Sequence, residues 1–135
     1  MWQFSKRNIH LKSALSVALL ASSFSQIFAN TLQQQVDAAV AAFGEGNYAQ
    51  AYWTLESIEL DYGQEPEFLD KAFQGTVLPV RAYSAMMADR PTYALVFFRE
   101  LLTEHNPRPG VRAFAIYNSA IALSQANALS AAAEA

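Results

Sequence analysis

From Thr31 onward the sequence alternates between helix-forming stretches and short segments rich in glycine, proline and asparagine. Apolar residues recur every three or four positions within each stretch, which is the period of a helix with one buried face. No stretch shows the sustained alternation of a strand. We therefore expect an all-α fold whose helices end at these segments. The breaks are Gly44 to Gly46, Gly63 to Pro66, Asp89 to Pro91, Asn106 to Gly110, and a weaker one near Asn127.

The breaks divide the chain into three predicted antiparallel helical hairpins, at about residues 31–62, 68–105 and 111–135, the last of them incomplete. Pro91 suits the first turn of a helix, where its missing N–H leaves no bond unmade. Pro79 instead falls inside a predicted helix from Phe68 to Ala88, where proline removes a backbone hydrogen bond. We expect a kink at Pro79, or two shorter helices that meet there.

Alanine pairs flank the breaks at one constant separation of 12 residues, namely Ala39 with Ala51, Ala82 with Ala94 and Ala120 with Ala132. Small residues allow two helices of a hairpin to approach closely, and large residues four positions later fill the space beside them. We therefore expect nine residues to pack between the helices of the hairpins. They are Ala39, Tyr48, Ala51, Leu55, Ala82, Ala94, Phe98, Ala120 and Ala132.

This pattern resembles the tetratricopeptide repeat (TPR) family over about Leu32 to Ala135. The first unit carries Gly46-Asn47-Tyr48, Ala51, Leu55 and a late Pro66, and the second carries Ala82, Ala94, Phe98 and Pro107. Pro91 replaces the turn tyrosine of the second unit, and Asn127 stands where the third would have its glycine. The equivalent alanines are 43 and then 38 residues apart, against the family's 34. The resemblance implies hairpins stacked as a short TPR-like α-solenoid, and generic α-solenoid hairpins are the alternative.

The resemblance also implies a binding surface. In this family the first helices of successive hairpins line a concave groove that holds peptides or helices. Tyrosine and methionine suit such adaptable contacts, and packing against the next repeat is their alternative role. At the matching positions the groove would include Tyr83, Met86 or Met87, Tyr117, Ile121 and Gln125.

The N-terminus has the three-part layout of a secretory signal peptide. Basic residues in the first dozen positions precede an uncharged run from Ser13 to Phe24, and cleavage is expected after Ala29. This divides the chain into a signal at 1–29 and a repeat domain at 30–135. The apolar run is shorter than the roughly 20 residues of a membrane span, although an uncleaved anchor is the alternative. We expect export to the periplasm or cell envelope of a bacterium.

Composition argues against catalysis, metals and nucleic acid. Beyond the signal, 6 basic residues face 12 acidic ones, so no basic patch for a phosphate backbone remains. The chain has no cysteine, and His105 is the one histidine of the mature part, so neither a hydrolase triad nor a zinc site is expected. His105 should interact with the end of its helix. Glu56 and Glu59 should only solvate an exposed face.

We therefore expect no cofactor and no enzymatic activity, but a scaffold that binds a protein or peptide. The competing hypothesis is a docking module of a larger envelope enzyme, transport or assembly machine whose active part lies beyond Ala135. The sequence ends partway through the third predicted hairpin, at "SAAAEA". Because repeat arrays need a solvated terminal element, we also expect self-association through this incomplete repeat.

Overall fold

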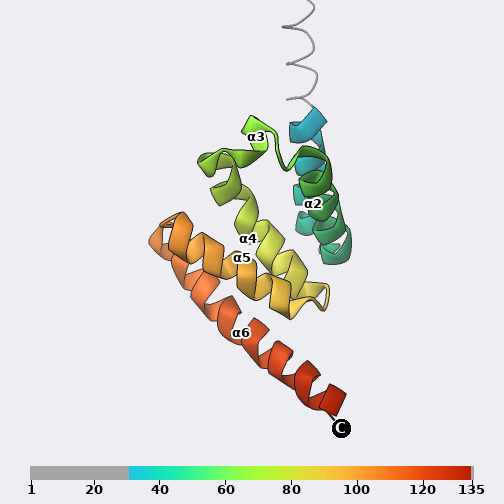
Figure 1. The fold of residues 1–135 in the computed structure, drawn as a ribbon, viewed down its shortest axis with the longest axis vertical. Helices are drawn as coiled ribbons and strands as arrows, with labels where there is room; N and C mark the ends of the chain where they lie inside the picture. Colours follow the sequence, from blue (N-terminus) through green and yellow to red (C-terminus); the bar gives the residue numbers. More distant parts are fainter. Residues whose placement is uncertain (1–30, 135) are drawn as a thin grey trace, which may run out of the picture. The chain divides into compact units, whose positions relative to one another are not determined.

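The computed structural model describes residues 31–134, which are helical apart from the connecting turns and contain no strand (Figure 1). The all-α prediction is confirmed for this part, whereas the predicted signal peptide lies outside the described residues. Residues 31–34 are helical and belong to a separate compact unit. Residues 35–134 lie in the second compact unit, which contains α2 to α6. No helix of the described part is long and apolar enough to cross a membrane. The helices are residues 31–44, α2 (Tyr48–Tyr62), α3 (Pro66–Leu69), α4 (Lys71–Met87), α5 (Pro91–Glu104) and α6 (Pro109–Glu134).

The first hairpin pairs residues 35–44 with α2 in antiparallel orientation. The rings of Phe43 and Tyr48 lie 5.4 Å apart beside the turn, and Gln35 donates to the Tyr62 hydroxyl at the other end. The predicted break is confirmed, because Gly46 has φ +79°, a conformation that glycine adopts without strain. The side chain of Asn47 then accepts a hydrogen bond from the Gln50 N–H and caps α2.

The second hairpin pairs α4 with α5 through the three-residue turn at 88–90. Asp70 caps α4 by accepting from the Phe73 N–H at 2.9 Å, and Pro91 occupies the first turn of α5 as predicted. Near the open end, the His105 ring lies against Gly75, so α4 and α5 run antiparallel. Ala82, Ala94 and Phe98 are completely buried, as the alanine pattern predicted for this unit.

Pro79 does not divide α4. The helix is continuous from Lys71 to Met87, so the alternative of two shorter helices is wrong. Proline inside a helix removes one backbone bond and is unfavourable by about 3 kcal/mol. Packing offsets this, because α4 lies between α2 and α5 and buries Leu78 and Met86. The break before α4 instead contains α3, a single turn that the sequence did not predict.

The third predicted hairpin is absent. α6 runs without interruption from Pro109 to Glu134, so the predicted break near Asn127 is wrong. A lone asparagine costs a helix only a few tenths of a kcal/mol to about 0.7 kcal/mol, and the residues after it are mainly alanine, the best helix former. Ala120 and Ala132 are exposed, which corrects their predicted packing role. Ala115 and Ala122 are the completely buried alanines of α6 instead.

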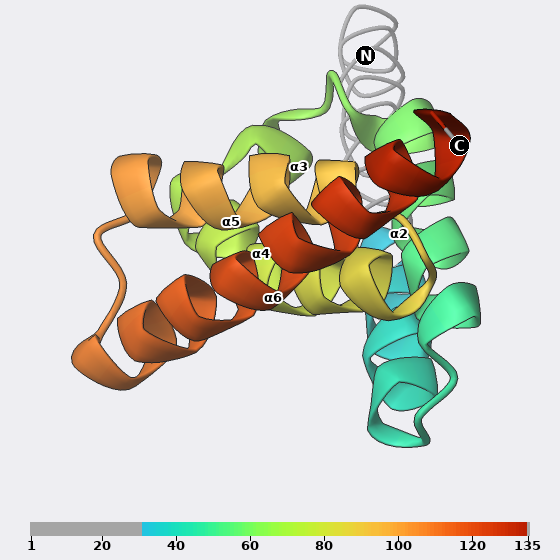
Figure 2. The ribbon, with the colours of Figure 1, turned by 90° about the horizontal axis from the view of Figure 1, so that it is seen from below.

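The core is built by packing each helix on the next. α2 packs on α4, α4 on α5 and α5 on α6, and Figure 2 shows α6 running along α5. The last turns of α6 extend past the α4–α5 turn, and the residues after Leu129 are exposed (Figure 1). A series of neighbouring rings, with centroids 5.4 to 6.1 Å apart, connects the helices, in the order Phe43, Tyr48, Tyr83, Phe114 and Phe98.

Candidate binding site

A hollow of about 640 Å³ opens between α2, α3, α4 and α5, and we call it the α2–α5 hollow. Its volume falls in the range of small-ligand and side-chain pockets. Four helices contribute to its lining because α4 separates α2 from α5 and leaves a depression between them. The lining residues are Glu59, Gly63, Phe68, Leu69, Lys71, Gln74, Arg81, Val96, Phe97, Glu100, Glu104 and His105.

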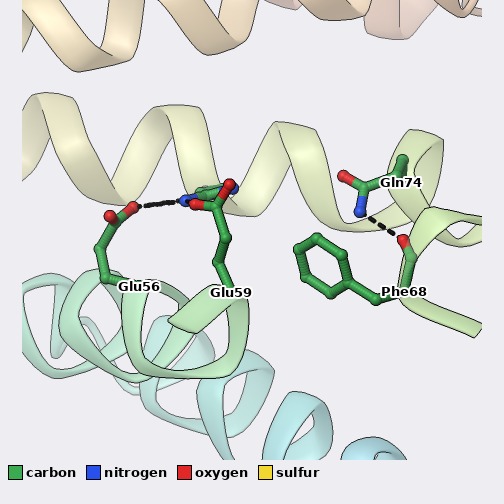
Figure 3. A network of polar contacts seen from close by, with 5 residues as sticks. Glu56, Glu59, Phe68 and Gln74 are labelled. Atoms are coloured by element: carbon green, nitrogen blue, oxygen red, sulfur yellow. Dashed lines mark hydrogen bonds and ion pairs between the residues drawn. The ribbon is translucent and has the colours of Figure 1, made fainter. Parts of the chain in front are cut away.

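The floor of the hollow is formed by Arg81 of α4, which is only 6% exposed. Its Nη2 donates to Glu56 Oε1 at 2.7 Å and also to Glu59 Oε2, while its Nε donates to Glu56 at 3.1 Å. Figure 3 shows Glu56 and Glu59 projecting from α2 toward α4. The prediction that these two glutamates only solvate a helix face is wrong, because they hold a buried cation between two helices.

The guanidinium also lies over an aromatic ring. The Cζ of Arg81 is 4.2 Å from the centroid of the Phe97 ring, so Arg81 contacts α5 as well as α2. Burial by itself would lower the pKa of Arg81, but the hydrogen bonds to Glu59 and Glu56 more than reverse this and raise the pKa above its ordinary value. Arg81 therefore remains charged at any physiological pH and needs its carboxylate partners.

One wall of the hollow comes from α5. Val96, Glu100 and Glu104 follow one another at four-residue intervals, so they share a face of the helix, with Phe97 beside them. Val96 is 56% exposed, and Glu100 is half-buried. Neither Glu100 nor Glu104 makes an ion pair with any residue that the structure describes. This wall therefore combines an apolar surface with two unneutralised carboxylates.

The opposite wall comes from α3 and the start of α4. Phe68 is buried at 7% exposure, and in Figure 3 its ring points toward Glu59. The side-chain amide of Gln74 donates to the backbone carbonyl of Phe68, which attaches the short helix α3 to α4. Lys71 stands at this edge, and His105 closes the end of the hollow beside Gly75.

The net charge of the hollow is negative. The lining contains three carboxylates, from Glu59, Glu100 and Glu104, against two basic residues, Lys71 and Arg81. Arg81 shares its charge with two carboxylates on the floor. The remaining carboxylates on the α5 wall therefore determine the electrostatic potential that a ligand meets on entering.

The residues predicted for a concave groove differ in how far they are exposed. Met86 is 3% exposed and belongs to the core, so it cannot contact a ligand, which corrects that prediction. Tyr83 is half-buried among the rings of Phe43, Tyr48 and Phe114. Ile121 is also half-buried and packs against the core.

The other three predicted groove residues are exposed. Met87 is 46% and Tyr117 is 69% exposed, and Gln125 lies at the surface of α6. Gln125 lines a second, smaller hollow of about 230 Å³ together with Asp89, Pro91, Ala128 and Leu129. This second hollow lies where α6 passes the α4–α5 turn.

The α2–α5 hollow was not predicted, although the sequence holds one signal of it. Arg81 follows Leu78 by three positions and precedes Ala85 by four, which places an arginine on the buried stripe of α4. Arginine is almost never buried without a partner. That position therefore indicated a carboxylate from another helix, but it did not indicate which one.

Among residues 31–134, no three histidine, aspartate or glutamate side chains gather in a way that could hold a metal ion. Comparisons of the chain with protein-family models, with curated proteins and with solved structures found no match.

Proposed function

We propose that this protein is a non-catalytic scaffold that binds other proteins. The observation that carries the proposal is the α2–α5 hollow, in which exposed apolar side chains adjoin carboxylates that no residue of the described part neutralises. Ligand pockets typically combine apolar walls with a few polar groups that fix the orientation of the ligand. The proposed protein-binding role is the same whether the chain acts as a scaffold by itself or as the docking module of a larger envelope enzyme, transport or assembly machine.

We further propose that the hairpins are TPR-like. Two features support this: α2, α4, α5 and α6 pack each on the next, and completely buried alanines lie in the first two hairpins at the positions that the repeat pattern assigns. The long α6 departs from the pattern after the start of the third unit. Export to a bacterial periplasm or cell envelope belongs to the same proposal and depends on the N-terminal sequence alone.

Site-specific photo-crosslinking tests the binding role. A photoreactive phenylalanine analogue replaces Val96, which lies on the wall of the hollow, in the full chain. The control carries the same analogue at Ala49, an exposed position in the first turn of α2, far along the helix from Glu59. We expect a discrete protein adduct from envelope extract at Val96 and none at Ala49. Equal adduct patterns at both sites, or none at Val96, would contradict the proposal.

A further inference from the structure

We infer that the α2–α5 hollow receives a basic side chain, arginine or lysine, from an extended segment of a protein partner. This inference rests on the proposed protein-binding function and specifies the chemistry of the ligand. It follows from three properties of the hollow: a floor whose cation is already neutralised, a wall with two free carboxylates, and apolar surfaces between them.

The floor does not attract an anion. Arg81 is the buried cation of the hollow, but it donates to both Glu56 and Glu59, so two negative charges surround one positive charge. Its guanidinium face is also covered by the Phe97 ring. A phosphate or carboxylate that approached Arg81 would have to displace these partners and would meet their charge at close range.

The wall attracts a cation. Glu100 and Glu104 lie one turn apart on the same face of α5, and neither makes an ion pair within the described part of the chain. Residues at this spacing have Cβ atoms roughly 5–6 Å apart, so one guanidinium or ammonium can contact both carboxylates. Lys71, at the opposite edge, is a single cation against these two charges.

The apolar surfaces suit the aliphatic part of such a side chain. Val96 and Phe97 on α5 and Phe68 beside α3 line the same hollow as the two carboxylates. Long basic side chains bury their methylene groups along apolar surface while the charged end stays near water or a carboxylate. The hollow is much larger than one side chain, so flanking residues of the partner segment enter with it.

An isothermal titration of the full chain with synthetic peptides tests the inference. The probe is an eleven-residue peptide of alanine, serine and leucine with a central arginine. Its matched forms carry citrulline, which is the uncharged analogue, or glutamate at the centre. At low salt we expect the arginine peptide to bind about tenfold more tightly than the citrulline peptide, since weak screening strengthens the attraction between one guanidinium and two carboxylates. Backbone NMR shifts should map to the stretch from Val96 to Glu104.

A charge-matched pair of variants locates the effect. The double variant Glu100→Gln with Glu104→Gln should abolish the preference for arginine over citrulline. The control, Glu45→Gln with Glu134→Gln, changes the net charge equally at exposed positions outside the hollow and should retain the preference. Thermal melts of both variants should match that of the parent protein, because these side chains make no ion pair in the described part.

Other outcomes overturn the inference. Equal binding of the arginine and citrulline peptides, tighter binding of the glutamate peptide, or an unchanged preference in the Glu100 and Glu104 variant would each contradict it. Failure of every peptide to bind would also contradict it. In all these cases the crosslink at Val96 separately decides whether a protein occupies the hollow, so the two proposals fail on different observations.

Discussion

Arg81 shows how a single residue can join several elements. It extends from α4, pairs with two glutamates of α2 and lies over a ring of α5. Its partners are 22 and 25 residues earlier in the chain, so the contacts form only when the helices pack. Because the charge of Arg81 is buried, removing both glutamates would leave it without compensation.

We expect Arg81→Ala to lower the free energy of unfolding by about 1–3 kcal/mol, since it removes the hydrogen bonds to Glu56 and Glu59, whose carboxylates are partly exposed and remain solvated. Chemical denaturation measured by circular dichroism provides the test. Arg99→Ala, at an exposed position of α5, should change the free energy by no more than about 0.5 kcal/mol. A loss below about 1 kcal/mol for Arg81→Ala would show that the buried pair contributes little.

Tyr52 carries a prediction about pH. Burial, and secondarily the charge of Glu56, raise the pKa of its hydroxyl above 10.0. The folded protein therefore holds this proton more tightly than the unfolded chain does, so stability should be complete below pH 10 and fall as pH rises toward the higher folded pKa. Unfolding curves between pH 9 and about 11 should show this loss, and Tyr52→Phe should reduce it. Tyr117→Phe, which removes a tyrosine that is 69% exposed, is the control and should retain the loss.

At the scale of the helix, the breaks and the buried face follow different rules. The ends of α2 and α5 depend on residues within one or two turns, such as Gly46 and Pro91, and the sequence indicated them correctly. The buried face of α6 depends on how that helix lies on α5. The alanine pattern therefore predicted Ala120 as a packing residue, whereas Ala115 and Ala122 occupy the interface.

This difference predicts opposite outcomes for one substitution at two alanines. Ala94→Leu should destabilise the protein by about 1–3 kcal/mol, because Ala94 is completely buried in α5 and the added atoms overpack the core. Ala120→Leu should change the free energy of unfolding by no more than about 0.5 kcal/mol, because that side chain points to solvent on α6. Thermal or urea melts of the two variants measure both effects. Equal losses would mean that α6 packs through the face that the repeat pattern assigned.

For residues 35–134 as a whole, the outer face of α6 has no covering element. Ile116 is 55% and Leu123 is 52% exposed, and they share one face of α6 because they are seven residues apart, while the neighbouring Tyr117 is 69% exposed. Exposed apolar side chains that gather on one helix face favour association with another surface. They support the expectation that the chain self-associates through its C-terminal helix.

We therefore expect sedimentation velocity to show a concentration-dependent dimer that Leu123→Glu weakens by at least about tenfold in Kd, since the substitution places a charge in an apolar contact. The matched control is Ala49→Glu, at an exposed position of α2, which should leave the association unchanged. A monomer at all concentrations, or a dimer insensitive to Leu123→Glu, would contradict association through this face.

The sequence by itself determined the helical class, the turns at Gly46 and Asp89–Pro91, and the small-residue contacts of the first two hairpins. These features arise from local conformational preferences and from the periodicity of one helix. Only the tertiary structure decided that α4 and α6 are continuous, that Met86 is buried, and that Arg81 meets Glu56 and Glu59 beneath the α2–α5 hollow. Those outcomes depend on which faces of separate helices meet. The faces that meet are determined by the summed free energy of many contacts between residues far apart in the chain.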